Sequence, residues 1–331
     1  MRNTLSLPTA SSLVRATLLA GVAAAAGGAW AQPAWPAKPI SIVVAYPAGG
    51  DTDAVARLLA EKLSTRLKQP VLVDNRPGAS GVIGSSFVGK ALPDGYTLLM
   101  APSTFTMAQL VLKTGPGSSY DVRAFTPIFQ VGAQPLFLVA GGSTKLQSVS
   151  DAVRAGKSTP MTYASPGSGS PMHVLGEMFN KAAGTSFKHV PYRGVAPALT
   201  DVVGGHVPLT WITYGPVEPY LKDGKIRLLG VAQAERSALA PSVPTLAEQG
   251  VAGVGVTAWN GLYGPKGLPA NITQTLNKHL NEIIREPEVA QRMRTLGMIP
   301  VGGTPETLSK TTIADLERFT QVVKDLGIQA D

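Results

Sequence analysis

The sequence predicts an α/β protein built as two lobes, and two observations support this prediction. Apolar, β-branched runs that are typical of buried strands repeatedly precede small, polar segments that open a helix. The chain has 331 residues, 44% of them hydrophobic and 15% charged, with 36 Gly and 27 Pro. It is therefore globular, loop-rich and long enough for two domains.

The first strand and helix set the pattern. The run ISIVVAYP from Ile40 is continuous and β-branched, which favours a strand covered on both faces. After Gly49-Gly50, apolar positions from Val55 to Leu67 recur at helical spacing. Further strand–helix units are expected at 70–91, 96–112 and 161–184, and short strands at 208–214 and 226–232. A doubly wound α/β sheet follows from this alternation.

Residues 1–31 have the pattern of a secretory signal peptide. Arg2 and Arg15 precede an Ala-rich apolar run, and the letters AWA that end at Ala31 form an A-x-A cleavage pattern. The run is too short to span a bilayer. We expect export to the periplasm and cleavage near Ala31, which leaves 27 of the 29 basic residues against 21 acidic ones, a net charge of +6. This spread surplus is typical of a solvated surface, and steering of small anions towards a cleft is the alternative.

Several classes of chemistry have no signature in the chain. It contains no cysteine, which excludes disulfides, thiolate metal sites, Cys nucleophiles and a lipobox anchor. The four histidines show no metal-ligand spacing, and neither a P-loop nor a dinucleotide-binding glycine pattern occurs. We expect no metal, no cofactor and no enzymatic activity.

A serine hydrolase is the enzyme alternative. Ser168 and Ser170 lie near His173, although no G-x-S-x-G elbow is present. Ser168 and His173 are five residues apart, on one loop and helix start, whereas the base of a triad normally comes from elsewhere in the chain. The spacing argues against catalysis.

Two glycine-containing loops are candidate anion sites, one at Gly49-Gly50 and one at 165–170. Each leads from a strand into a helix and presents backbone N–H groups at the positive end of the helix dipole. A tight turn with positive φ is the alternative for either loop alone. Their occurrence in both halves favours a ligand site between the lobes.

Some side chains in these regions have two interpretations. Asp51 or Thr52 can act as N-cap of the first helix, and Asp53 is a first-turn acid that suits the helix dipole. His173 either caps nearby loop groups or contacts a ligand. Three aromatic residues could line a pocket, with core packing as the alternative for each: Trp211, Tyr214 and Trp259.

Seven segments occur in order over nearly the whole chain after residue 31: YPAGGDTDAVAR, VLVDNRPGASGVIG, PDGYTLL, TYASPGSGSPMH, HVPYRGVAPALTDVVGGHV, GKIRLLGVA and PTLAEQG. Through them the chain resembles the Bug, or TctC-like, periplasmic solute receptors of tripartite tricarboxylate transporters. The resemblance is specific for the family and much less specific for the ligand.

The resemblance implies a two-lobed type II periplasmic-binding-protein fold. Each lobe is a mixed sheet flanked by helices, and crossing strands join the two. Lobe 1 is expected at 32–131 plus 252–331, and lobe 2 at 132–251. A monomer of this family captures a small carboxylated ligand between the lobes and delivers it to the membrane subunits of a tripartite transporter, with no role for nucleic acid. A ligand-responsive periplasmic sensor that docks on a membrane signalling protein is the alternative.

The resemblance also implies the ligand-binding residues. Backbone amides of the first Gly-Gly loop grip one carboxylate in this family, and the second loop meets the other side of the ligand. Asp201 either orients the wall of lobe 2 or acts as a structural cap. The expected ligand-binding residues are Tyr46, Ala48, Gly49, Gly50, Asp51, Thr52, Asp53, Ser103, Thr104, Ser165, Gly167, Ser168, Gly169, Ser170, His173, Asp201, Thr213 and Tyr214.

Two departures from the family pattern bear on the ligand. Asp51 follows the Gly-Gly pair where an uncharged residue is frequent, and GGHVPLTWITYG replaces a segment that often carries an acid. The second change adds Trp211 and Tyr214, so an aromatic or amphipathic carboxylate is as plausible as a citrate-like one. Asp51 itself is expected either to cap the helix or to pair with an ammonium group on the ligand.

Overall fold

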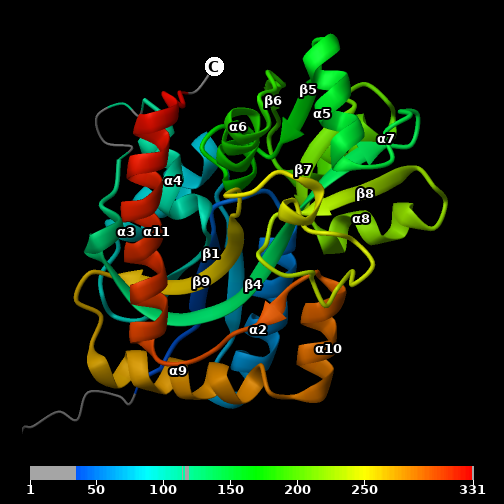
Figure 1. Cartoon of the computed structure of the whole chain (residues 1–331). Coiled ribbons are helices and arrows are strands. Elements are labelled where there is room, and N and C mark those ends of the chain that lie inside the picture. Colours follow the sequence, from blue (N-terminus) through cyan, green and yellow to red (C-terminus); the bar gives the residue numbers. More distant parts are fainter. Residues whose placement is uncertain (1–34, 114, 116–118, 330–331) are drawn as a thin grey trace, which may run out of the picture. The chain divides into compact units, whose positions relative to one another are not determined.

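The computed structural model describes residues 35–113, 115 and 119–329, and the described residues from 38 onwards form one compact unit (Figure 1). The predicted signal peptide lies outside the described residues. The strands are β1 (Ile40–Val44), β2 (Val71–Asn75), β3 (Thr97–Pro102), β4 (Phe125–Gly141), β5 (Thr162–Ser165), β6 (Lys188–Pro191), β7 (Leu209–Thr213), β8 (Ile226–Val231), β9 (Thr257–Pro265) and β10 (Ile299–Pro300). The α-helices are α2 (Asp51–Leu67), α3 (Val82–Gly89), α4 (Thr104–Val111), α5 (Val149–Ser158), α6 (Pro171–Ala183), α7 (Val195–Val203), α8 (Tyr214–Leu221), α9 (Ala270–Ile283), α10 (Pro287–Thr295) and α11 (Pro305–Leu326).

The strands form a mixed sheet in the order β2-β1-β3-β9-β4-β7-β5-β6, and β8 and β10 also pair with β4. β1 is parallel to both β2 and β3, and β5 is parallel to both β6 and β7. β9 is antiparallel to β3 and β4. The predicted strand–helix alternation and mixed sheets are confirmed.

Strand β4 crosses from one half of the sheet to the other (Figure 1). Its first half pairs with β9 and β10, and its second half pairs with β7 and β8. The lobe boundary expected after residue 131 falls inside this strand, and the one after residue 251 falls in the segment before β9. β4 is thus one of the crossing strands of the fold, while the lobe boundaries stay a prediction.

Helix α2 shows how apolar spacing places a helix on the sheet. Val55, Leu59 and Leu63 recur every four residues and are fully buried, as expected for the sheet-facing side of an amphipathic helix. The helix begins at Asp51, and its N-cap is Gly50, which has extended backbone angles and makes no side-chain cap bond. The expectation that Asp51 or Thr52 caps the helix is wrong, because both residues already lie in its first turn.

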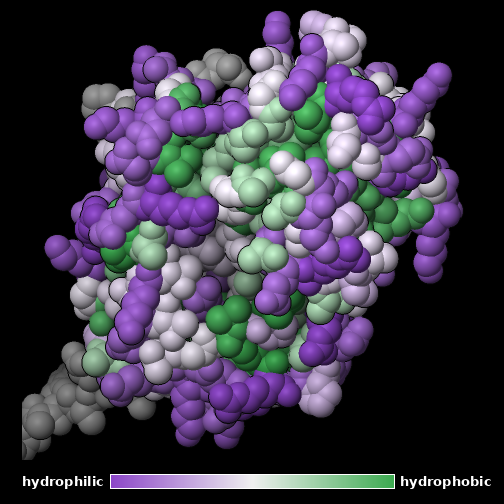
Figure 2. All heavy atoms as spheres, viewed as in Figure 1, coloured by the Kyte–Doolittle hydropathy of each residue, from purple (hydrophilic) through white to green (hydrophobic). Residues whose placement is uncertain are grey.

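The surface in Figure 2 is mostly hydrophilic, with apolar side chains gathered over β10. Ile299 of β10 and the neighbouring Val301 are large apolar side chains that are 38% and 44% exposed. No described helix combines the length and apolar character that a membrane crossing needs.

Candidate ligand-binding site

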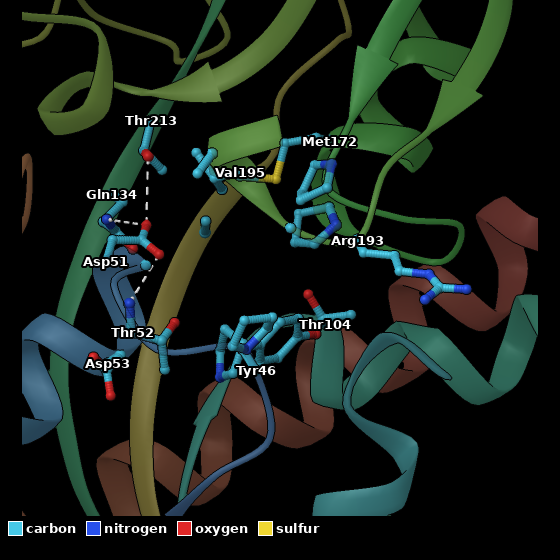
Figure 3. A pocket seen from close by; sticks show the side chains of 18 of the residues that line it. Tyr46, Asp51, Thr52, Asp53, Thr104, Gln134, Met172, Arg193, Val195 and Thr213 are labelled. Atoms are coloured by element: carbon cyan, nitrogen blue, oxygen red, sulfur yellow. Dashed lines mark hydrogen bonds between the residues drawn. The ribbon is translucent and has the colours of Figure 1, made fainter. Parts of the chain in front are cut away.

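A pocket with about 720 Å³ of empty space, partly open to solvent, lies where the loops after β1, β3, β5, β6 and β7 meet (Figure 3). This is the carboxyl end of parallel strands, the usual ligand position in an α/β sheet. The predicted residues in its wall are Tyr46, Ala48, Gly50, Asp51, Thr52, Asp53, Ser103, Thr104 and Thr213. The wall also contains residues that were not predicted, namely Pro47, Pro102, Gln134, Pro166, Pro171, Met172, Arg193, Gly194, Val195, Ala196, Pro197 and Ala258.

The loop between β1 and α2 is shaped by Asp53. Its carboxylate accepts hydrogen bonds from the Gly49 N–H at 2.9 Å, from Arg57 Nε at 3.0 Å and from Asn75 Nδ2 at 2.9 Å. Gly49 has a φ of 88°, the left-handed conformation that favours glycine. The Gly49 amide is therefore committed to Asp53, and Gly49 does not line the pocket.

The charge on Asp53 is balanced by Arg57, one turn further along α2. Burial alone would raise the pKa of Asp53, which is only 3% exposed, but hydrogen bonds from Arg57, Gly49 and Asn75 hold that pKa below its usual value. Asp53 lines the pocket with its acceptor atoms already engaged. Asp53 therefore stabilises the conformation of the loop between β1 and α2.

Asp51 lies one position into the same helix and faces the pocket. Its Oδ1 accepts from the Thr52 N–H at 2.8 Å, and its Oδ2 accepts from Gln134 Nε2 at 3.0 Å and from Thr213 Oγ1 at 3.4 Å (Figure 3). Gln134 was missed in the sequence, because a polar residue within an apolar strand carries no local signal of its partner. The carboxylate links α2 to β4 and β7.

The hydrogen-bond network behind Asp51 fixes the orientation of the Gln134 side-chain amide. Asn260 Nδ2 donates to Gln134 Oε1 at 3.0 Å, and Thr52 Oγ1 donates to Asn260 Oδ1 at 3.1 Å. With its oxygen occupied, Gln134 presents its NH₂ group to Asp51. Gln134 and Asn260 are 2% and 1% exposed, so these bonds also satisfy buried polar groups.

Several N–H groups at the start of α2 face no acceptor among the described residues. They belong to Ala48, Gly50, Asp51 and Asp53. Free N–H groups at a helix start are the donors that an anion site needs. Six N–H groups of this loop were expected to bind the ligand. Four of them remain available, because those of Gly49 and Thr52 donate to Asp53 and Asp51.

The loop after β5 contributes differently from what the sequence predicted. Pro166, Pro171 and Met172 line the pocket. The predicted residues of this region do not line it, namely Ser165, Gly167, Ser168, Gly169, Ser170 and His173. Their polar atoms close the loop on itself and on its neighbours.

Individual contacts explain this inward orientation. Ser165 is fully buried and lies 2.6 Å from His189 Nε2, and Ser170 is the N-cap of α6, accepting from the His173 N–H at 3.2 Å. The Gly169 N–H donates to His173 Nδ1 at 3.1 Å. His173 thus accepts from a loop amide, which fits the capping interpretation.

The serines and histidines of this loop do not have the geometry that a serine hydrolase needs. His173 Nδ1 is engaged by the Gly169 amide, and the Ser168 carbonyl accepts from Ser80 Oγ at 2.8 Å. In the serine–histidine pair that is in contact, Ser165 is fully buried and His189 is partly buried, and this burial lowers the pKa of His189 to about 4. No group of three His, Cys, Asp or Glu side chains in the described part of the chain could hold a metal ion.

A third loop, which sequence reasoning missed, lies between β6 and α7. Arg193, Gly194 and the first turn of α7 line the pocket. Gly194 is the N-cap with a φ of 119°, and the N–H groups of Val195 and Ala196 have no acceptor within the described residues. This is the same strand–glycine–helix signal as in the first two loops, within the segment PYRGVAPA.

The remaining predicted residues have structural roles. Asp201 on α7 accepts a hydrogen bond from the Tyr192 hydroxyl, which supports the wall next to Arg193, and it does not line the pocket. Burial, together with this carboxylate, raises the pKa of Tyr192 to about 12. Tyr46 lines the pocket and donates to the Ser80 carbonyl at 2.9 Å, and burial raises its pKa. Ser103 exchanges hydrogen bonds with the backbone of Trp259.

The expected aromatic surface is not part of the pocket. Trp211 is 1% exposed and packs against Phe179 of α6 with ring centroids 5.4 Å apart. Tyr214 packs against Phe137 at 5.9 Å. Trp211 is covered by α6 and belongs to the core, and Tyr214 is partly buried and packs against β4. Of the three residues Trp211, Thr213 and Tyr214, only Thr213, at the end of β7, lines the pocket.

Comparison with known proteins places the chain in a family. Its residues 55–328 match the family model described as the tripartite tricarboxylate transporter family receptor. The chain belongs to this family. The protein BugT of Bordetella pertussis is 35% identical to this receptor over 296 residues, covering 88% of this chain and 90% of the relative.

Solved structures of similar proteins support the same family assignment. Rpa4515 of R. palustris, solved with adipate, is 33% identical with a TM-score of 0.84, covering 89% of this chain and 99% of that one. MatC from Rhodopseudomonas palustris, with bound malate, is 29% identical with a TM-score of 0.81, covering 87% of this chain and 100% of that one. The resemblance, the periplasmic-binding-protein fold and the receptor class, as opposed to an enzyme, are confirmed.

The Asp53 network predicts a pH-dependent contribution to stability. Because the pKa of folded Asp53 lies below the unfolded value of about 3.9, the stabilisation is present above that pH and is lost as the pH falls through the folded pKa. We expect Asp53→Asn to lower the free energy of unfolding by about 1–3 kcal/mol near pH 7 and by much less near pH 2, measured by urea denaturation.

Asp74→Asn is the matched control. Asp74 pairs with Arg76 at 2.7 Å with both side chains about two-fifths exposed, so its loss should cost at most about 1 kcal/mol. Equal effects of Asp53→Asn at both pH values would contradict the electrostatic explanation.

Proposed function

We propose that this chain is an extracytoplasmic solute receptor that captures a small carboxylated ligand in the pocket and delivers it to the membrane subunits of a tripartite tricarboxylate-type transporter. The observation that carries the proposal is the pairing of two helix starts, α2 and α7, whose free N–H groups border one pocket. Family relatives of the same fold are solved with adipate and with malate.

The donor set suits a carboxylate. Amides of Ala48 and Gly50 on one side, and of Val195 and Ala196 on the other, can bind anionic oxygens in charge-assisted hydrogen bonds. Helix dipoles add roughly 0.3–1 kcal/mol each at such positions. The Thr104 hydroxyl and the Arg193 guanidinium are further donors in the wall.

Capture between the lobes accounts for the position of the pocket. We propose lobe 1 at 32–131 plus 252–331 and lobe 2 at 132–251, with closure as a hinge motion through the crossing strands. Ser80 Oγ and the Ser168 carbonyl, 2.8 Å apart, lie on the two proposed lobes and join them on one side of the pocket. We also propose that the receptor acts as a monomer.

A thermal-shift screen of mono-, di- and tricarboxylates on the chain without residues 1–31 tests the proposal. A ligand at 100 times its Kd should add about 2.7 kcal/mol to the free energy of unfolding. The ligand should be recovered unchanged after incubation. If no carboxylate raises the melting temperature, or if the ligand is consumed catalytically, the proposed function is wrong.

The role of the first loop is tested by Gly50→Val. Gly50 has a φ of −80°, and an added Cβ would meet nothing closer than the Pro47 carbonyl at 3.9 Å, so the variant should fold. Its side chain would crowd the free amides, and we expect ligand affinity to fall by about 10-fold or more, the effect of losing one charge-assisted hydrogen bond. Isothermal titration measures this loss.

Gly115→Val is the control for this substitution. Gly115 lacks positive φ, has no atom within 4 Å of an added Cβ and does not line the pocket. Unchanged affinity in folded Gly50→Val would mean that the first loop is only a turn.

The export signal gives a separate prediction. We propose cleavage after Ala31, because the A-x-A pattern ends there and no cysteine offers a lipid anchor. Mass spectrometry of periplasmic material should find a chain that starts at Gln32. Recovery of the intact chain with Met1 would refute this processing.

A further inference from the structure

Asp51 gives the pocket an acidic side chain with no cationic partner. No Lys, Arg or His nitrogen in the described part of the chain lies within 4 Å of its carboxylate, whereas Asp53, two residues further along, pairs with Arg57 at 3.0 Å. The donors that reach Asp51 are all uncharged, namely the Thr52 amide, Gln134 and Thr213. Asp51 thus lies in the pocket wall with no cationic side chain beside it.

The carboxylate also keeps capacity for a further donor. Two carboxylate oxygens offer about four acceptor positions, and the three bonds to Asp51 include a long one of 3.4 Å from Thr213. Gln134 is fixed by Asn260 with its NH₂ group towards Asp51. The Asp51 carboxylate is therefore a hydrogen-bond acceptor in the pocket wall, and a ligand carboxylate placed against it would meet a like charge.

Donor side chains, of which Arg193 is the cationic one, lie elsewhere along the same pocket. In Figure 3, Asp51, Gln134 and Thr213 lie at one side of the view and Thr104 and Arg193 at the other. Tyr46, Val195 and Met172 lie between them in the view, and Val195 marks the start of α7. Arg193 makes no ion pair with any described residue.

We propose that the ligand is a zwitterion, an amino carboxylate whose ammonium group binds the Asp51 carboxylate and whose carboxylate binds free amides of the two helix starts, Thr104 and Arg193. Asp51 is then the residue that selects amino carboxylates over plain dicarboxylates. An ammonium group supplies three N–H donors and the missing positive charge, and charge-assisted hydrogen bonds of this kind are about twice as strong as neutral ones. The inference rests on the proposed function, since it assigns the two ends of the proposed carboxylate pocket.

The apolar wall limits the body of the ligand. Four prolines and a methionine line the pocket and offer few hydrogen-bond partners, namely Pro47, Pro102, Pro166, Pro171 and Met172. A short aliphatic or small aromatic segment between the ammonium and carboxylate groups fits this lining.

The test uses pairs of probes that differ in one group. Aspartate and malate differ by an ammonium in place of a hydroxyl, and δ-aminovalerate and adipate differ by an ammonium in place of a carboxylate. Isothermal titration should show the wild-type chain binding the ammonium member of at least one pair about 10-fold or more tightly, the effect of a charged hydrogen bond. A preference for malate and adipate over their ammonium partners would overturn the inference.

Asp51→Asn isolates the residue. It should weaken the preferred ammonium probe by about 10- to 100-fold and leave its partner probe equally or more tightly bound, because the like charge is gone. Asp51→Ser serves the same purpose if Asp51→Asn does not fold, and Asp74→Asn, an exposed acid outside the pocket, is the charge-matched control. Equal weakening of both members of a pair would assign Asp51 a purely structural role and refute the inference. If neither these probes nor any carboxylate of the wider screen binds the wild-type chain, the proposed function itself is wrong.

Discussion

The pocket depends on one continuous strand, β4, which pairs with β9 over its first half and with β7 and β8 over its second. Gln134 lies just before this change of partner, opposite Ala258 of β9. Its buried amide joins Asn260 of β9 to Asp51 of α2. An unpaired buried amide costs about 1–3 kcal/mol. Gln134 thus links the three elements that meet at the pocket, and the bond from Thr52 to Asn260 joins α2 to β9 directly.

Local periodicity was enough to predict the elements around this strand. The β-branched run at Ile40–Val44 and the helical spacing of Asp51–Leu67 depend on neighbours along the chain, and both appear as expected. The N-terminal boundary of this helix was harder to predict. Gly50 takes the cap position without a side-chain bond, and Asp51 turns to partners on β4 and β7 that its own segment does not reveal.

The second loop illustrates why site residues are harder to predict than elements. Its glycines and serines suggested amides presented to a ligand, yet Ser165 bonds to His189 and Gly169 bonds to His173, so the prolines form the wall. Which atoms of a loop face outward is decided by such closing bonds, and those depend on tertiary contacts. The opposite error occurred at Gly194, where the strand–glycine–helix signal was present but its strand, Lys188–Pro191, is short and largely polar. The Gln134–Asn260 pair shows the same limit at longer range, because 126 residues separate the two amides and only the antiparallel pairing of β4 with β9 brings them together.

In the proposed closure, few polar bonds join the two sides of the pocket. Ser80 donates to the Ser168 carbonyl at 2.8 Å, from a backbone in which Ala79 and Ser80 both have positive φ, a conformation that costs free energy for residues other than glycine. The bond from Thr213 to Asp51 is long, at 3.4 Å. A ligand shifts a conformational equilibrium only by its difference in affinity for the two states. A ligand that binds α2 and α7 at the same time has this difference in affinity, because it can contact both helix starts only in the state in which they border one pocket. Under the proposed zwitterion, the charge that neutralises Asp51 arrives with the ligand, so the interaction that selects the ligand also favours the closed state.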